Sequence, residues 1–179
     1  PWTVELSIAA IPLTTQRSVY FEALRPHVVG YLAEFLPELG EARLKFDPGF
    51  DDELDLGEVL SATVDRDRAR GYTGAGPHRA DWSVTFEAAR RKEHLSRGQE
   101  KLCAFALVLA QAHLFHHRFG EWPVICLDDL ASELDAAHQR RILGAVDGTG
   151  AQVLLTGTEE PRGIADVRRP VARFHVEQG

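Results

Sequence analysis

Two adjacent carboxylates, Asp128 and Asp129, directly follow the apolar run 124–127. Charged side chains at the end of a buried strand are costly unless a ligand uses them, and ligands of open parallel sheets bind at this end of the strands. One carboxylate can hold a hydrated magnesium ion while its neighbour orients or deprotonates a water molecule. The alternative is an acidic turn that caps the next helix. Asp135 suffices as that cap, however, and leaves the pair unexplained.

A second group with chemical potential is Leu95-Ser96-Arg97-Gly98-Gln99, at the start of a long helical pattern. Ser96 and Gln99 have the spacing of a capping box, so an ordinary helix start is one explanation. A glycine in the first turn costs about 1 kcal/mol relative to alanine, and it permits close approach of another atom to the backbone. Exposed amides, the helix dipole and Arg97 then predict a phosphate site. With the paired carboxylates, this predicts a nucleotide site.

Other polar groups carry weaker signals. His78 and Arg79 stand in a glycine- and proline-rich turn, where they can contact nucleotide or DNA, or fix the turn to the core. Three arginines precede that turn: Arg66, Arg68 and Arg70. They can contact phosphates, although a solvated helix end explains them better. Three histidines have helical spacing: His113, His116 and His117. The glutamate of a zinc-protease helix is missing beside them, so we assign them no metal.

The elements that must position these groups follow from periodicity and turn residues. We expect helices over residues 1–37, 56–70, 96–118 and 136–146. We expect strands over residues 43–46, 82–86, 124–127, 153–155 and 171–176. The strand, helix, strand order after residue 96 predicts an α/β layer. The helix over 96–118 is apolar on nearly every side and the run 124–127 is unbroken, which predicts a buried helix and a fully buried parallel strand.

Composition fits one globular domain. The chain has 179 residues, 44% apolar and 26% charged, which excludes a disordered chain. The longest strongly apolar stretch, residues 102–110, is about half of a bilayer span. Cys103 and Cys126 lie in apolar runs, which predicts two buried, reduced thiols and a cytoplasmic protein. Methionine is absent, even at position 1, which indicates either part of a longer protein or modified residues lost from the written sequence.

Charge is unevenly distributed. The net charge is -8 over residues 1–65, +4 over 66–101 and -3 over 102–179. A pI near 5.6 argues against nucleic acid as a partner, but the middle segment can present a basic face. On charge alone, a solvated face explains that segment better.

These motifs resemble those of a known family. Residues 95–99 resemble the signature motif of ABC-type ATPases, 124–129 their Walker B motif, and 132–135 their D-loop. Three further stretches are similar to the RecF family, relatives of the SMC-type chromosome ATPases: residues 71–81, 156–158 and 174–179. Most ABC ATPases have Glu as the second acidic residue. Here Asp129 stands there, which implies slow hydrolysis, and Thr158 stands where most have a switch histidine.

The resemblance implies an α/β fold, the C-terminal part of an ABC-type (SMC/RecF-like) ATPase head with a mainly helical arm. Residues 1–70 would form the arm (part of lobe II) and 71–179 the C-terminal ATPase lobe. A Walker A loop needs Gly-Lys followed by Ser or Thr, and this chain has no Gly-Lys pair. We therefore expect that loop upstream, and no ATP turnover by this chain alone.

In the full-length protein the resemblance implies a weak, ATP-dependent DNA-binding ATPase of recombinational repair and replication restart, linked to the SOS response. ATP and Mg²⁺ are the implied ligands, with Asp128 on the metal and Asp129 catalytic. The implied nucleotide-binding residues are Ser96, Arg97, Gly98, Gln99, Ser132, Asp135 and Thr158. ATP would join two subunits into a homodimer that clamps double-stranded or gapped DNA. Recombination-mediator proteins are the expected further partners.

Two alternatives stay open. The first is a non-catalytic module of the ABC-ATPase fold that binds a protein partner through its acidic arm. The intact pair Asp128 and Asp129 speaks against it. The second is another SMC-type repair ATPase with a long coiled coil, and the absence of sustained heptads speaks against that.

Overall fold

The computed structural model describes residues 2–51, 53–88 and 95–176, without the side chain of Glu133. Two compact units are present: Pro1–Val29 with Glu38–Lys92, and Gly30–Pro37 with Glu93–Gly179. Helix α1 (Trp2–Phe35) contributes to both units. It confirms the helix predicted over residues 1–37, and it continues through two internal prolines, Pro12 and Pro26. In the described part of the chain, none of the helices has an apolar stretch that could span a membrane.

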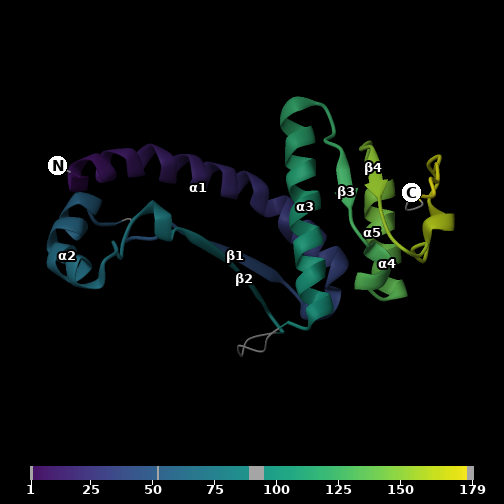
Figure 1. Ribbon diagram of the computed structural model, residues 1–179, viewed down its shortest axis with the longest axis horizontal. Helices are drawn as coiled ribbons and strands as arrows, with labels where there is room; N and C mark the ends of the chain where they lie inside the picture. The colour runs from purple at the N-terminus through teal and green to yellow at the C-terminus, as the bar shows by residue number, and fades with distance from the viewer. Residues whose placement is uncertain (1, 52, 89–94, 177–179) are drawn as a thin grey trace. The chain divides into compact units, whose positions relative to one another are not determined.

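The first unit combines helices with one antiparallel strand pair (Figure 1). After α1 its elements are β1 (Ala42–Asp47), α2 (Leu56–Arg70), the 3₁₀ turn η2 (Pro77–Arg79) and β2 (Asp81–Phe86). The predicted helix over 56–70 is confirmed at both ends. Asp55 accepts the Glu58 N–H over 2.9 Å as the N-cap, and Gly71, at φ 78°, ends the helix.

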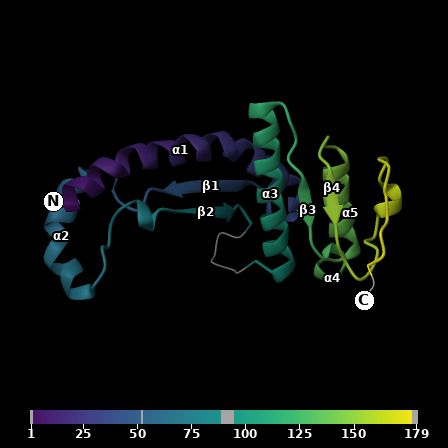
Figure 2. The same ribbon diagram turned by 45° about the horizontal axis from the view of Figure 1, so that its top comes forward.

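Strands β1 and β2 confirm the two strands predicted in this region. Their register places Ala42 opposite Phe86, Leu44 opposite Val84 and Phe46 opposite Trp82. Because side chains alternate along a strand, these six apolar side chains share one face. Helix α1 runs along the pair (Figure 2), and the rings of Phe21 and Phe46 lie 5.6 Å apart. The alternation of apolar residues therefore selects the face that meets α1.

The second unit is a parallel strand pair with helices (Figure 1). Besides the end of α1 and the turn η1 (Pro37–Leu39) at the unit boundary, its elements are α3 (Arg97–Phe119), β3 (Ile125–Leu127), α4 (Leu130–Glu133), α5 (Ala136–Asp147), β4 (Val153–Leu155) and η3 (Ile164–Asp166). The strand, helix, strand order is confirmed, with Ile125 paired to Val153 and Leu127 to Leu155. Fully buried side chains of three helices form the core: Leu102, Leu109, Leu130 and Ile142.

Burial in the second unit is one-sided, which corrects three predictions. Strand β3 is not fully buried, because Ile125 and Leu127 are buried but Cys126 between them is exposed. The prediction of two buried thiols is therefore wrong for Cys126. Cys103 is half-buried, and burial raises the pKa of its thiol to about 11. Helix α3 also exposes apolar side chains, among them Val108 and Phe119. An apolar run shows that a segment can be buried, but the neighbouring elements decide which faces are covered.

The strand predicted over residues 171–176 is wrong. Residues 171–176 have no regular secondary structure, and Val171, Phe174 and Val176 are exposed. Alternating apolar residues form a strand only when a second strand takes up their backbone hydrogen bonds. Residues 177–179 of the motif that begins at Phe174, and residues 89–94 of the basic middle segment, lie outside the described residues. The division into an arm over residues 1–70 and a lobe over 71–179 stays a prediction.

Candidate functional site

The paired carboxylates lie at the carboxyl end of the parallel strands. Asp128 and Asp129 directly follow β3, and Thr156 directly follows β4. The Thr156 hydroxyl donates a hydrogen bond to the Asp128 carboxylate. The Asp129 N–H also donates to the Thr156 carbonyl over 3.1 Å. Because parallel strands end at the same edge of a sheet, residues 28 positions apart form one site.

Asp129 has an uncommon backbone conformation. Its φ of 45° and ψ of 42° make it the one described non-glycine residue in the left-handed region, which Asp adopts more readily than most residues. The hydroxyl of Ser132, in α4, donates to Oδ2 of Asp129. Oδ1 of Asp129 is buried and has no hydrogen-bond partner among the described residues. Such an acceptor can take a proton donor from outside the chain.

The oxygen donors at this edge are compatible with magnesium. Carboxylate and hydroxyl oxygens are hard ligands, and magnesium sites commonly combine one or two carboxylates with phosphates and water. The Asp128 side chain is exposed, so an ion can reach it. Among the described residues, no group of three or more His, Cys, Asp or Glu side chains could hold a metal ion. An ion at Asp128 would therefore need ligands from phosphates and water as well.

The start of α3 has the predicted capping box. Ser96 Oγ accepts the Gln99 N–H over 3.3 Å, and Gln99 Oε1 accepts the Ser96 N–H over 3.0 Å. The first intrahelical bond runs from Glu100 N to Ser96 O. The N–H groups of Arg97 and Gly98 precede it and have no acceptor within the helix. Such amides at a positive helix end are suited to an anion.

Packing among the described residues does not require glycine at position 98. A Cβ built there would meet only Ser96 Oγ, at 4.0 Å. Alanine would fit this space and favour the helix by about 1 kcal/mol. The absence of a side chain therefore leaves open backbone on the outer surface of the helix start.

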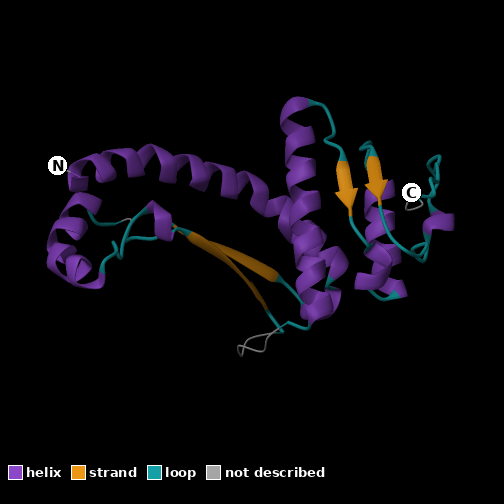
Figure 3. Ribbon diagram, viewed as in Figure 1, coloured by secondary structure: helices purple, strands orange, loops and turns teal. Residues whose placement is uncertain are grey.

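Both groups lie at the same end of the second unit. Helix α3 runs antiparallel to β3 and β4 (Figure 3). Its N-terminus therefore lies at the same end of the unit as the carboxyl ends of both strands. The structure thus presents a helix start with open amides and a carboxylate edge from separate elements of one unit.

Ser132 and Asp135, the two residues at the ends of the predicted D-loop, have local partners. Asp135 is the predicted N-cap of α5 and accepts the N–H groups of Ala137 over 2.9 Å and His138 over 3.0 Å. Its second oxygen lies 2.7 Å from His138 Nδ1. The hydrogen bond from the His138 backbone and the contact with its ring hold the pKa of Asp135 below its ordinary value, against the opposing effect of burial. The Thr158 side chain is exposed, two residues beyond Thr156.

Two residues of this region have a role that the sequence does not predict. Thr156 stands in one of the motifs similar to the RecF family, and it is the residue that meets Asp128. Gln139 is 4% exposed, and its Nε2 donates to the carbonyls of Leu134 over 2.6 Å and Ala131 over 3.0 Å. Its Oε1 accepts the Arg162 N–H over 2.6 Å. A glutamine on the buried face of an amphipathic helix is the signal that could have revealed this role.

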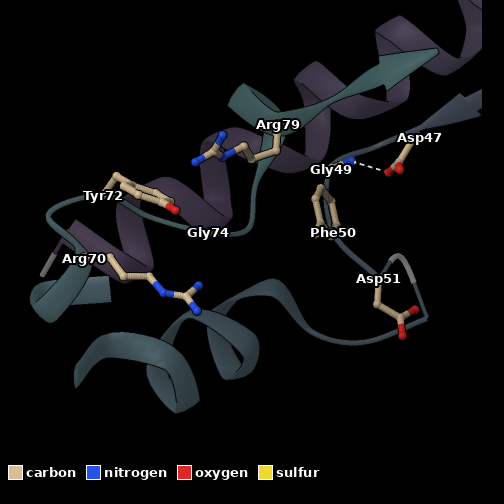
Figure 4. A pocket seen from close by; sticks show the side chains of 8 residues that line it. All are labelled: Asp47, Gly49, Phe50, Asp51, Arg70, Tyr72, Gly74 and Arg79. Atoms are coloured by element: carbon tan, nitrogen blue, oxygen red, sulfur yellow. Dashed lines mark hydrogen bonds between the residues drawn. The ribbon is translucent and has the colours of Figure 1, made fainter. Parts of the chain in front are cut away.

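His78 and Arg79 lie in the first unit. His78 Nε2 lies 2.9 Å from the Thr73 carbonyl, which supports a role in fixing the turn. Arg79 lies over the Tyr72 ring, 4.9 Å from its centroid, and lines an open pocket (Figure 4). Of the two, Arg79 is the one that lines the pocket.

Two of the three histidines of α3 pack against an aromatic ring. The ring of His116 stacks on Trp122 at 4.3 Å, and His113 meets the edge of the same indole at 5.4 Å. The Tyr31 hydroxyl lies 3.3 Å from His113 Nδ1. Two of these histidines therefore belong to an aromatic cluster of the second unit.

Known proteins resemble this chain over almost all of its length. No family model matches the chain. The DNA replication and repair protein RecF of Stenotrophomonas maltophilia (strain R551-3) is 48% identical over 177 residues, which cover 98% of this chain and 48% of that protein. RecF of Shewanella halifaxensis (strain HAW-EB4) is 39% identical over 180 residues, with 99% and 49% covered. The chain thus spans about half the length of the curated relatives it matches.

A solved structure has the same fold. The structure of the recombination mediator protein RecF-ATP in the RecFOR pathway matches with a TM-score of 0.70 and 22% identity, over 88% of this chain and 44% of that one. The described residues therefore have a mixed α/β fold that resembles part of that structure. The predicted resemblance to the RecF family is confirmed, because the chain matches curated RecF proteins over almost its whole length and about half of theirs.

Proposed function

We propose that this chain is the C-terminal half of an ABC-type ATPase of recombinational repair and replication restart. The full-length protein hydrolyses ATP weakly, dimerises around ATP and clamps double-stranded or gapped DNA. Support comes from the names of the relatives, which are DNA replication and repair proteins, and from the RecF-ATP structure with the same fold. Cytoplasmic location and partnership with recombination-mediator proteins are parts of the same proposal.

The observation that carries the proposal is the edge formed by Asp128, Asp129 and Thr156. Asp128 would hold Mg²⁺ beside the Thr156 hydroxyl, and the ion supplies charge neutralisation on the phosphates of ATP. Asp129 is the general base. Its Oδ1, which has no hydrogen-bond partner among the described residues, accepts a hydrogen bond from the attacking water, while Ser132 keeps Oδ2 in place. The shorter side chain of Asp, compared with Glu, accounts for weak turnover.

The second half of the site is the start of α3. The N–H groups of Arg97 and Gly98, which have no acceptor within the helix, bind phosphate oxygens of ATP held by the opposite subunit together with the Arg97 side chain. Ser96 and Gln99 shape the turn. Asp135 orders α5 next to Ser132, and Thr158 follows β4 toward the nucleotide. The arrangement makes ATP part of the dimer interface. A chain without a Gly-Lys pair cannot complete it alone.

The test is a pair of substitutions in the full-length protein. Asp129→Asn should leave ATP binding and the ATP-bound dimer intact while slowing hydrolysis about 10²- to 10⁴-fold, the usual contribution of a positioned base. Asp128→Asn should instead weaken magnesium-dependent nucleotide binding. Nucleotide affinity, dimer mass and turnover are measured on each variant.

Asp166→Asn is the matched control, because Asp166 is an exposed carboxylate of the same unit in η3. It should leave all three measurements unchanged. Equal and mild effects of Asp128→Asn and Asp129→Asn would show a structural pair and favour the non-catalytic module.

A further inference from the structure

We propose that a groove in the first unit binds single-stranded nucleic acid, with phosphates on Arg70 and Arg79 and an unpaired base against Tyr72. The groove has a volume of about 660 Å³ and is open to solvent. Figure 4 shows Arg70, Tyr72 and Arg79 on one side, and the acidic residues Asp47 and Asp51 on the other. The inference rests on the proposed function in taking nucleic acid as the ligand. It adds where on the chain the nucleic acid binds and that the bound segment is single-stranded.

Arg70 differs from the neighbouring arginines of α2. Arg66 lies 3.8 Å from a carboxylate oxygen of Asp67, and Arg68 lies 3.7 Å from one of Asp65. Arg70 forms no hydrogen bond or ion pair with any described residue and lines the groove instead. The sequence suggests one explanation, a solvated helix end, for all three arginines. In the structure Arg70 differs from Arg66 and Arg68, because it faces the groove and has no acidic partner among the described residues.

Arg79 supplies the second positive charge on the same side. Its guanidinium lies over the Tyr72 ring, 4.9 Å from the centroid, which holds both side chains in place. Planar guanidinium groups bind phosphate oxygens in pairs of hydrogen bonds. Two arginines on one wall of an open groove are therefore suited to successive phosphates of a flexible backbone.

Aromatic rings in the groove favour a strand with unpaired bases. Tyr72 is 54% exposed, so much of its ring is free to stack on a base. Phe50 also lines the groove, and it packs on the buried cluster of Ala10, Leu56 and Leu60. Aromatic side chains stack on bases of single strands, whereas the bases of a duplex are already stacked on one another.

The acidic side of the groove fits the same ligand. Asp47 accepts the Gly49 N–H over 2.8 Å and Asp51 accepts the Glu53 N–H over 3.1 Å, so each carboxylate has one oxygen engaged in a turn. The other oxygens repel phosphate but accept hydrogen bonds from base amino groups. A nucleotide carries both a phosphate and a base. Its phosphate would face the arginines of the groove, and its base would face the aspartates. Oligo-dC should therefore bind more tightly than oligo-dT, which has no amino group.

The loops that build the groove are held together before any ligand arrives. Gly76 N donates to Gly49 O over 2.9 Å, and a Cβ on Gly49, whose φ is +83°, would lie 2.4 Å from Gly76 O. Arg17 Nη1 donates to the Pro77 carbonyl over 2.6 Å. The two walls of the groove are thus joined by contacts that only glycine allows at position 49.

Fluorescence anisotropy of the 179-residue chain with labelled oligo-dC of about 12 nucleotides, without ATP, tests the proposal. Arg70→Ala and Arg79→Ala should each weaken binding about tenfold. Each should also reduce the slope of log affinity against log salt by about 0.7. Arg68→Ala is the matched control, because it removes the same charge from α2 outside the groove. Equal losses for Arg70→Ala and Arg68→Ala would overturn the proposal.

Further variants test the base contact. Tyr72→Leu should weaken binding of oligo-dC several-fold, whereas Tyr72→Phe keeps the stacking ring and should bind like the parent chain. Asp51→Asn should reduce the preference for dC over dT. Duplex DNA that binds as tightly as oligo-dC, or Tyr72→Leu that binds as well as Tyr72→Phe, would overturn the proposal. Without ATP in the assay, these results are independent of ATP-driven dimerisation.

Discussion

At the scale of single residues, each carboxylate of the candidate site is held by a hydroxyl group. Thr156 donates to Asp128, and Ser132 donates to Asp129. A hydroxyl orients a carboxylate without neutralising it, so both charges remain available to a ligand. The left-handed backbone of Asp129 then turns the chain directly from β3 into α4.

Gln139 is the residue that ties this turn to the rest of the unit. We expect Gln139→Leu to lower the free energy of unfolding of the chain by about 2 kcal/mol. The substitution would leave the Leu134 carbonyl and the Arg162 N–H without their partners inside the protein, and a buried polar group without a partner costs about 1–3 kcal/mol. Urea unfolding, with the midpoint and the m-value both fitted, measures the change.

Gln152→Leu is the matched control, since Gln152 directly precedes β4 and its side chain is exposed. It should change the free energy of unfolding by less than about 0.5 kcal/mol. If both substitutions have the same small effect, the hydrogen bonds of Gln139 do not stabilise the turn.

At the scale of elements, polar N-caps position the helices of the site. Ser96 caps α3 with its reciprocal bond to Gln99, and Asp135 caps α5 through two backbone N–H groups. The caps set where each helix begins, and so where free amides and carboxylates stand relative to the strand ends. Gly120, at φ 76°, ends α3 and allows the chain to return toward β3.

The cap of α5 predicts a pH dependence. The pKa of Asp135 is lower in the folded chain than in the unfolded one, so its ionisation stabilises the fold above the unfolded value of about 3.9. That contribution is lost as the pH falls through the lower, folded pKa. We therefore expect the stability of the chain to decline below about pH 4, measured by chemical denaturation at a series of pH values.

Two variants at position 135 isolate this effect. Asp135→Asn keeps an acceptor for the cap but does not ionise, so the part of the acid decline that belongs to Asp135 should disappear. Asp135→Ala removes the acceptor and should cost about 1 kcal/mol at neutral pH. An acid decline identical in the parent chain and in Asp135→Asn would contradict the assignment.

At the scale of the whole molecule, two units carry different chemistry. The first holds the groove with Arg70 and Arg79, and the second holds the carboxylate edge and the start of α3. The chain spans about half the length of its curated relatives. A site that needs a phosphate loop as well as these elements must therefore draw on more than this chain.

Ser96→Arg should abolish ATP-dependent dimerisation of the full-length protein while ATP binding to the monomer persists. A long cation at the start of α3 would fill the space meant for a phosphate of the opposite subunit, and we expect dimer affinity to fall about 100-fold or more. Light scattering with and without ATP measures the mass.

Gln111→Arg is the control, because it places the same new charge on an exposed position of the same helix, away from its start. It should dimerise normally. The 179-residue chain should show no ATP turnover in the same buffer, because it has no Gly-Lys pair. A dimer of Ser96→Arg, or turnover by the chain alone, would refute the model of a site shared between subunits.

The sequence by itself determined the local features of this protein: its helix ends and the pairing face of its antiparallel strands. The spacing of Ser96 and Gln99 produced the capping box, and the alternation around Val84 produced the paired strands β1 and β2. The helix end at Gly71 followed in the same way. These features depend on residues close in the chain or on a period of side chains, and both are visible without a fold.

Only the tertiary structure decided which distant residues meet and which faces stay open. It brought Thr156 to Asp128, placed both Arg70 and Arg79 in one groove, and left Cys126 exposed although its neighbours in β3 are buried. It also left residues 171–176 without a strand partner among the described residues. The physical reason is common to all four: hydrogen-bond partners and covering layers come from segments far away in sequence, and no local pattern specifies them.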